Sequence, residues 1–229
     1  MQRIYTGWYQ RIIGNMILQG PTLEIGGGGG NLKEFYPDLI SSDFTFCPWL
    51  DVNLDGHHLP FLSNSLANIV VIDVLHHLAK PVNFIREAQR VLKKDGRLLM
   101  FEPCISPASY LIYNYLHQED VDFSPDVFSE EMWGGGDLKN PFDGNMAIPT
   151  SMFLRQAEKF RKYFPDFKII ETSCSDYFIY PLSGGFEHPN LIPGFFLPVM
   201  RFFERCMDPV GSFFAFRLLV VLANEKNGK

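Results

Sequence analysis

Five consecutive glycines, at positions 26–30, follow a short apolar run that carries one acid, Glu24. Glycine lacks a Cβ, so a strand that turns through glycines into a helix lets a ligand approach the backbone closely. The dinucleotide-binding pattern G-x-G-x-x-G/A fails here, because its third position falls on Asn31 or Leu32. A P-loop is also excluded, since no Gly-Lys-Ser/Thr follows. The pattern that fits is acid-x-Gly-x-Gly-x-Gly, formed by Glu24, Gly26, Gly28 and Gly30.

Three further acids follow predicted strands. Asp43 closes the second apolar run, 19 residues after Glu24, where a carboxylate can accept hydrogen bonds from two ribose hydroxyls. Asp55 opens the stretch D-G-H-H-L-P-F, and its rival Asp51 lies four residues earlier. Asp73 ends the β-branched run 67–72, at the end of a strand where ligands of open α/β sheets bind. An acid that merely caps a turn is the alternative interpretation at Asp43.

These motifs, with 69–78 and 84–100, resemble class I S-adenosylmethionine-dependent methyltransferases, specifically the family with a type 11 methyltransferase domain. The resemblance covers residues 23–103 and implies S-adenosylmethionine as the cofactor. It places Glu24 near the charged end of the methyl donor and Asp55 at the adenine amino group, with the next backbone N–H donating to the ring. Gly56 replaces the alanine that is usual in the family, and Lys-Asp-Gly at 94–96 replaces Pro-Gly-Gly. The implied cofactor-binding residues are Glu24, Gly26, Gly27, Gly28, Asp43, Phe44, Asp55, Gly56 and Asp73.

Short β-like runs alternate with helical stretches from residue 22 onward, which favours a parallel sheet covered by helices. We predict strands at 22–26, 39–46, 50–54, 67–72, 97–101, 167–173 and 213–222, and helices at 81–94 and 151–164. The first helix after the glycines is expected to be short, because Asp43 comes early. The predicted fold class is α/β, a Rossmann-like, doubly wound, mostly parallel seven-stranded sheet with helices on both faces.

The length favours one methyltransferase domain over residues 1–229. We expect an N-terminal helix in 1–20, a cofactor-binding half at 21–103 and an acceptor-side half at 104–229, with insertions at about 105–150 and 185–210. The insertions are rich in aromatic residues, among them Tyr110, Tyr113, Tyr115, Phe195, Phe196, Phe202 and Phe203. These side chains could line an apolar acceptor pocket or lid, or pack in the core. A surface helix at 193–206 that touches a membrane or a partner is the least favoured alternative.

Charge and cysteine usage indicate which partners and which cellular compartment to expect for this protein. A net charge of −6 disfavours nucleic acid, so we expect a small-molecule acceptor. Four cysteines without C-x-x-C spacing, and no signal peptide, favour a cytoplasmic protein with reduced thiols. No metal site is expected, because the side chains of adjacent residues such as His76 and His77 diverge on a strand or helix. The oligomeric state is not predicted.

The favoured function is S-adenosylmethionine-dependent methylation of a small acceptor, with oxygen as the preferred atom and an apolar or aromatic substrate. One alternative is a catalytically silent cofactor-binding regulator, and another is an NAD(P)-dependent oxidoreductase. No catalytic residue is assigned. The candidates for a general base are His77, after the fourth strand, and His117, which Glu119 or Asp120 could orient.

Overall fold

The computed structural model describes residues 2–130, 143–183 and 192–226, and its centre is a seven-stranded sheet. The strands are β1 (Thr22–Ile25), β2 (Leu39–Asp43), β3 (Val52–Asn53), β4 (Leu66–Ile72), β5 (Leu92–Pro103), β6 (Phe167–Ser175) and β7 (Arg217–Asn224). Their spatial order is β3-β2-β1-β4-β5-β7-β6. Strands β1 to β5 pair in parallel, and β7 runs antiparallel to both of its neighbours. The predicted doubly wound, mostly parallel sheet is confirmed.

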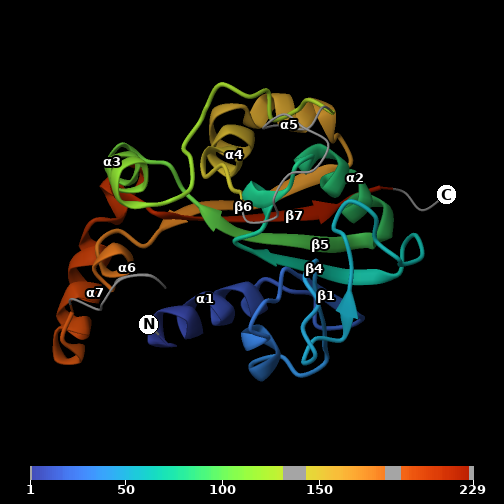
Figure 1. Ribbon diagram of the computed structural model, residues 1–229, viewed down its shortest axis with the longest axis horizontal. Helices are drawn as coiled ribbons and strands as arrows, with labels where there is room; N and C mark the ends of the chain where they lie inside the picture. The colour runs from blue at the N-terminus through green and yellow to red at the C-terminus, as the bar shows by residue number, and fades with distance from the viewer. Residues whose placement is uncertain (1, 131–142, 184–191, 227–229) are drawn as a thin grey trace.

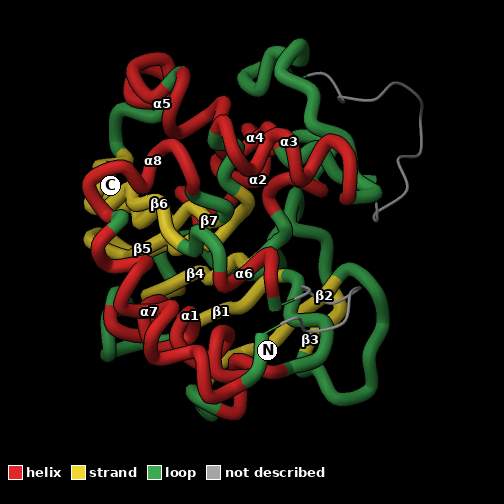
Figure 2. Tube along the Cα trace, turned by 90° about the vertical axis from the view of Figure 1, so that its left-hand side faces the viewer, coloured by secondary structure: helices red, strands yellow, loops and turns green. Residues whose placement is uncertain are grey.

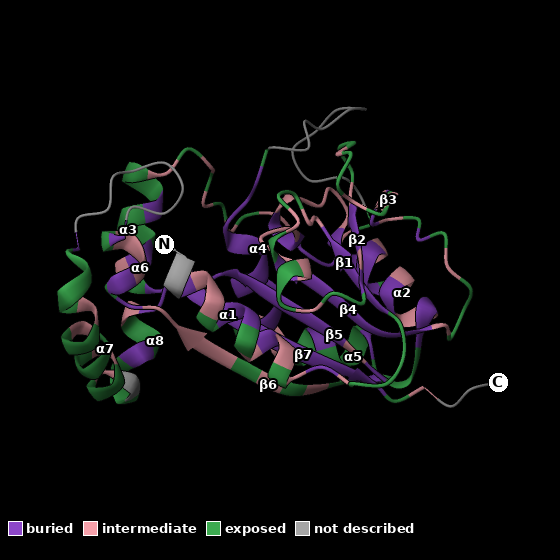
Figure 3. Ribbon diagram, turned by 90° about the horizontal axis from the view of Figure 1, so that it is seen from below, coloured by how far each residue is buried: buried purple, intermediate pink, exposed green. Residues whose placement is uncertain are grey.

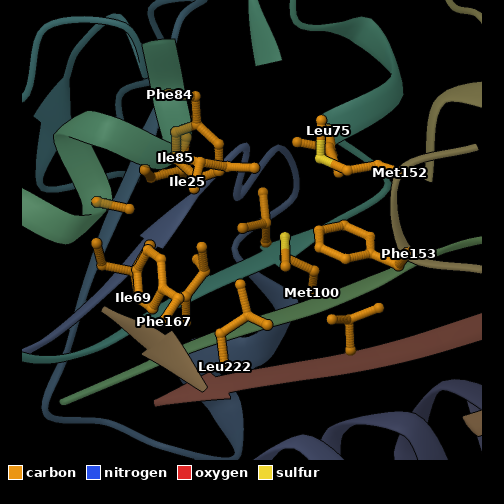
Figure 4. Packing of buried hydrophobic residues seen from close by; sticks show 14 of the residues in the cluster. Ile25, Ile69, Leu75, Phe84, Ile85, Met100, Met152, Phe153, Phe167 and Leu222 are labelled. Atoms are coloured by element: carbon orange, nitrogen blue, oxygen red, sulfur yellow. The ribbon is translucent and has the colours of Figure 1, made fainter. Parts of the chain in front are cut away.

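Helices cover both faces of the sheet (Figure 1). On one face lies α1 (Gln2–Gly14), and on the other lie α2 (Pro81–Val91), α4 (Ala147–Thr150) and α5 (Ala157–Tyr163). Successive side chains of β4 point to opposite faces. Ile69 and Val71 belong to the same buried cluster as Phe84 of α2, in which Figure 4 labels Ile69 and Phe84, whereas Val70 belongs to the cluster that contains Ile12 of α1. Two covered faces explain why β4 is apolar without alternation, as expected for a central parallel strand.

Element boundaries differ from the prediction beside tight turns. Helix α2 ends at Val91, three residues before the predicted end, and β5 begins at Leu92 instead of residue 97. Asp95, one residue after the predicted helix end, has a left-handed backbone (φ 63°) within β5. Strands β2 and β3 are shorter than predicted. The last strand begins at Arg217, because Phe213 belongs to a short helix, α8 (Gly211–Phe214).

The segment between β5 and β6 contains a helix that the sequence analysis did not predict, α3 (Pro107–Leu116). Ser106 accepts a hydrogen bond from the backbone N–H of Ser109, whose side chain bonds back to the Ser106 N–H. This capping box, with Pro107 in the first turn, was a readable signal for a helix start. The predicted helix 151–164 is interrupted at Gln156 and divides into the π-helical turn η3 (Ser151–Arg155) and α5. Residues 131–142 of the insertion expected at about 105–150 lie outside the described residues.

Two short 3-10 turns come after strands β1 and β4. The glycines lead into the first of them, η1 (Asn31–Glu34), which confirms that the first helix is short. The second, η2 (Leu75–His77), comes directly after β4 and carries the pair His76 and His77.

The elements after β6 gather with α3 at one end of the molecule (Figure 3). They are α6 (Ile179–Leu182), η4 (Gly194–Phe196), α7 (Leu197–Cys206), η5 (Asp208–Val210) and α8. Helix α7 has no buried side chain, and Phe195, Phe196, Phe202 and Phe203 are exposed. The alternative of core packing is therefore wrong for these four rings, whereas Tyr113 of the first insertion is buried as that alternative expects. From α7, Leu197 and Met200 are the residues that touch the core cluster beneath it. Within the described residues, every helix is too short or too polar to cross a bilayer.

Candidate functional site

The carboxyl ends of the parallel strands meet at one edge of the sheet (Figure 1), which is where ligands bind in open α/β sheets. The glycine loop 26–30 follows β1, Asp43 ends β2, Asp73 follows β4, and Glu102 lies near the end of β5. Asp55 and Gly56 follow β3. The structure thus brings the sequence-predicted residues to a single edge, although they are spread over 50 positions of the chain.

The glycine loop adopts backbone conformations that other residues rarely reach. Gly26, Gly28 and Gly30 have φ angles of 76°, 45° and 73°. A Cβ on Gly26 would lie 2.1 Å from Cγ2 of Val74, so this glycine allows the loop after β1 to touch the loop after β4. A Cβ on Gly28 would meet no atom within 4 Å. The space above Gly28 is therefore open, whereas Gly26 is needed for packing.

Glu24 is a buried acid with one carboxylate oxygen that no described residue satisfies. Its Oε2 atom is buried and has no hydrogen-bond partner among those residues. The same oxygen would lie 3.0 Å from a Cβ on Gly27, so the carboxylate lies directly beneath the loop. Burial, and then the nearby charge of Asp43, raise the pKa of Glu24 to about 7. A buried acid without a partner is costly unless a ligand supplies one.

Asp43 connects the end of β2 to the glycine loop. Its Oδ2 accepts from the backbone N–H of Gly28 at 3.0 Å, and its Oδ1 accepts from Thr45 at 2.8 Å. The Gly28 carbonyl in turn accepts from the Trp49 indole at 2.8 Å. The next residue, Phe44, is exposed. Asp43 therefore orders the loop, as well as offering a carboxylate at the edge of the open space.

Asp55 and Gly56 form the next part of the edge. The Asp55 carboxylate accepts from the backbone N–H of His57 at 2.9 Å and lies 2.7 Å from its Nδ1. A Cβ on Gly56 would make ordinary contacts at 3.6–3.7 Å, so the alanine usual in the resembling family would fit. The rival, Asp51, accepts instead from the Ser41 backbone and hydroxyl at 2.8 and 2.9 Å. Asp51 thus joins β2 to the turn before β3.

Asp73 is held by a buried cation that the sequence analysis did not single out. Arg217 Nη2 lies 2.6 Å from Asp73 Oδ1, and Asp73 has a left-handed backbone (φ 55°). The Arg217 guanidinium also lies 4.6 Å from the Trp8 ring and 4.9 Å from Phe101. The ion pair therefore links α1, β4 and β7 beside the site. It also engages one of the two oxygens of the Asp73 carboxylate.

A chain of three ionisable side chains crosses the same edge. Glu102 is fully buried at the end of β5, and its Oε2 lies 2.7 Å from His76 Nδ1. The other Glu102 oxygen accepts from the backbone N–H groups of Val74 and Leu75, both at 2.9 Å. His76 Nε2 lies 3.2 Å from Glu119 Oε2. The imidazole is thus held between two carboxylates, one buried and one partly exposed to solvent.

These contacts fix the charge state of the chain. Burial lowers the pKa of His76, but the two carboxylates outweigh it and raise that pKa to about 9. Burial raises the pKa of Glu119, but the contact with His76 outweighs it, so the net shift is downward. The pKa of Glu102 is also lowered, because His76 and two backbone N–H groups outweigh its burial. At neutral pH the chain is therefore carboxylate, imidazolium, carboxylate.

The expectation that His76 and His77 diverge is wrong. The 3-10 turn η2 places their rings 4.2 Å apart, which neither a strand nor an α-helix would do. His76, His77 and Glu119 offer ligand atoms within 4.8 Å of one another, so they could hold a metal ion. A metal on His76 Nε2 would have to displace the ion pair with Glu119, since Nδ1 already faces Glu102.

The loop that carries Glu119 is braced from a distant segment. Asn145 donates its backbone N–H to the His76 carbonyl at 3.0 Å, and its side chain bonds both ways with the backbone of Asp122. A Cβ on Gly144 would lie 2.1 Å from Glu119 Oε2. His117, the other sequence candidate, accepts from the Glu119 backbone N–H through Nδ1. The Glu119 carboxylate itself turns to His76, which the sequence analysis had not selected.

Comparisons with known proteins agree with this geometry. A family model described as a methyltransferase domain matches residues 23–100. An S-adenosylmethionine-dependent methyltransferase from Archaeoglobus fulgidus superposes with a TM-score of 0.60 at 13% identity, covering 97% of this chain and 94% of that one. Geranyl diphosphate C-methyltransferase from Streptomyces coelicolor gives 0.57 at 11% identity, over 98% and 80%. No protein with a curated functional description matches the sequence.

The matched residues contain the glycine loop, the acids after β2, β3 and β4, and the pair His76–His77. The strand order, with its antiparallel β7 between β5 and β6, is that of the solved methyltransferases. An oxidoreductase is therefore set aside, as the missing third glycine of the dinucleotide fingerprint already suggested. Residues 23–100 thus match a methyltransferase domain, and the chain has the fold of class I S-adenosylmethionine-dependent methyltransferases.

Proposed function

We propose that the protein methylates a hydroxyl oxygen of a small apolar or aromatic acceptor, and that Glu119 receives the acceptor proton. The observation that carries the proposal is the chain Glu102–His76–Glu119 at the carboxyl edge of the sheet. A hydroxyl must lose its proton as it is methylated, and a positioned base contributes about 10²–10⁴ in rate. Glu119 is the member of the chain with access to solvent, at 22% side-chain exposure.

The residues after β1 and β2 fit S-adenosylmethionine. The open space over Gly28 accepts a ligand against the backbone, and the unsatisfied oxygen of Glu24 suits a cationic group. Asp43 offers its carboxylate to ribose hydroxyls, and Asp55 with Gly56 offers an acceptor and a donor to adenine. When bound, the cofactor supplies an electrophilic methyl group on a sulfonium. We assign Gly26, Gly27, Phe44 and Asp73 to the walls of this site.

The chain's own residues then account for the proton. The acceptor hydroxyl would donate to the Glu119 carboxylate and pass its proton there as its oxygen takes the methyl group that bound S-adenosylmethionine would supply. His76 is a positioning residue, because its imidazolium orients Glu119 and is itself oriented by Glu102. The buried setting of this pair strengthens the interaction and fixes its geometry before the reaction.

Transfer of a labelled methyl group tests the proposed acceptor class. Matched aromatic compounds that differ only in a hydroxyl, an amine or a thiol are incubated with methyl-labelled S-adenosylmethionine, and products are identified by mass spectrometry. We expect the hydroxyl compounds to be methylated and the label to resist mild acid, as an ether does. Turnover of the amine or thiol in preference to the hydroxyl would contradict O-methylation.

Cofactor affinity should depend on pH through Glu24. Its pKa is raised to about 7 in the free protein, so below that pH the side chain is neutral and attracts a cation less. A bound cation favours the carboxylate, and affinity therefore increases as pH rises through 7. With one linked proton, S-adenosylmethionine should bind about tenfold more tightly at pH 8 than at pH 6. Calorimetry across this range measures the effect, and the matched variant Glu24→Gln should lack it. A cofactor affinity that does not change with pH in the parent protein would show that Glu24 does not contact the charged end of the cofactor.

Loss of the Asp43 carboxylate should weaken cofactor binding. Asp43→Ala removes the hydrogen bond to Gly28 and the predicted bonds to ribose, and we expect a loss of about 1.5–3 kcal/mol. Asp43→Asn keeps one acceptor for the Gly28 N–H, so it should lose less of the free energy of cofactor binding. Isothermal titration with S-adenosylhomocysteine measures both variants. Parent-like affinity in Asp43→Ala would show that Asp43 only caps the turn.

A further inference from the structure

The end of the molecule formed by α3, α6, α7 and α8 carries large apolar side chains in solvent. Figure 2 views the molecule from this side. We name as the apolar end the exposed residues Leu111, Tyr115 and Leu116 of α3 with Phe195, Phe202 and Phe203 of η4 and α7. Phe195 is 76% exposed and Tyr115 is 74% exposed. Large exposed apolar side chains gathered at one end of a molecule mark a candidate interaction site.

The elements of the apolar end are continuous with one another. Helix α3 packs against α8, α7 packs against α6 and η5, and α8 packs against η5. Figures 1 and 3 both place α3, α6 and α7 at the same end. Helix α7 presents Val199 and Phe202 in successive turns, with Phe195 one turn before them. These residues form the exposed face of an amphipathic helix lying along the surface.

Charge on α7 distinguishes among the partners that could cover this face. Arg201 and Arg205 are one turn apart and line a hollow of about 400 Å³ together with Leu197, Pro198 and Phe202. The one acid of the helix, Glu204, is directed inward. Its Oε1 accepts from the backbone N–H groups of Tyr177, Phe178 and Ile179, at 2.8–3.1 Å. With Glu204 bonded to α6, Arg205 supplies positive charge to the exposed face of α7, on a chain whose net charge is −6.

An anionic lipid surface has the chemistry that complements this face. Aromatic rings enter the boundary between headgroups and acyl chains, and arginines bind phosphate beside them. From these observations we propose that the apolar end docks on an anionic phospholipid bilayer. A second copy of this chain is the alternative occupant, and the test below separates it from a bilayer.

Docking would bring the carboxyl edge of the sheet, where the proposed cofactor and acceptor sites lie, to the bilayer. Helix α3 begins four residues after β5 ends, and β7 begins three residues after α8 ends, both at the carboxyl edge of the parallel strands. The apolar end and the site therefore share one side of the sheet. An acceptor that resides in the membrane interface would reach the site without crossing bulk water, consistent with the apolar acceptor proposed above.

Vesicle flotation with the full chain tests the inference without any acceptor. We expect binding to vesicles of phosphatidylcholine with phosphatidylglycerol, weaker binding to phosphatidylcholine alone, and release by salt. Phe195→Ser/Phe202→Ser and Arg201→Gln/Arg205→Gln should each lower the partition coefficient roughly tenfold. The matched controls, Leu62→Ser and Lys94→Gln, change an exposed apolar and an exposed basic residue elsewhere and should bind like the parent.

Calorimetry with S-adenosylhomocysteine verifies that each variant is folded, since the substituted residues lie outside the cofactor site. No binding of the parent to either vesicle would overturn docking, as would equal losses in the control variants. A dimer in sedimentation velocity that the phenylalanine variant converts to a monomer, without vesicle binding, would assign the apolar end to self-association instead. Because these readouts need no methyl transfer, their failure leaves the proposed O-methylation untouched.

Discussion

Glu119→Gln is expected to lower turnover of a hydroxyl acceptor by about 10²–10⁴-fold while cofactor affinity stays unchanged. The amide keeps the size of the side chain and its contact with His76 Nε2, but it cannot accept a proton at neutral pH. His76→Gln should give a smaller loss, because Glu119 remains but is no longer oriented by an imidazolium held on Glu102.

Two measurements separate proton transfer from a structural role of Glu119. With an acceptor that is already ionised, such as a carboxylate, Glu119→Gln should lose far less, since no proton remains to be removed. The control Glu130→Gln makes the same change at an exposed acid and should retain parent turnover. A loss of less than threefold in Glu119→Gln, with unchanged cofactor binding, would remove this carboxylate from the mechanism. Equal losses for hydroxyl and ionised acceptors would indicate damage to the acceptor pocket.

Gly28→Val is expected to abolish cofactor binding, with an affinity loss of at least about 100-fold. Two effects act together. The branched side chain would fill the open space over Gly28, where the cofactor is proposed to lie. The φ of 45° is also unfavourable for valine, at a cost of about 1–2 kcal/mol.

Variants at other glycines distinguish ligand space from backbone strain. Gly28→Ala adds strain but less volume, so it should bind the cofactor more tightly than Gly28→Val. Gly26→Ala should instead lower the unfolding temperature, because its Cβ would lie 2.1 Å from Val74. Gly14→Val, at the end of α1 with no atom near its added Cβ, should match the parent in both assays. Parent-like affinity of Gly28→Val in calorimetry would show that the cofactor does not lie over this loop.

The sequence by itself determined the sheet and the cofactor. The run of β4 is apolar at consecutive positions because both faces of a central parallel strand are covered, and such a run is readable without a structure. The glycine pattern is equally local, since φ angles of 45–76° at Gly26, Gly28 and Gly30 favour glycine over residues with a Cβ. Predicted boundaries were wrong where a single turn decided them, as at Asp95.

Only the tertiary structure decided which groups meet. Glu102, His76 and Glu119 come from a strand end, a 3-10 turn and a loop, and no periodicity in the sequence connects them. Local geometry also reversed one prediction, because η2 turns His76 and His77 to the same side.

Tertiary structure also decided which side chains are buried. In the sequence Arg217 interrupts an apolar strand, yet in the structure it is the buried partner of Asp73. The phenylalanines of α7 have the composition of a core helix, and whether such a face is covered depends on what the rest of the chain packs against it. Spacing along the chain fixes local conformation, whereas pairing between distant segments depends on how the sheet and its connections pack.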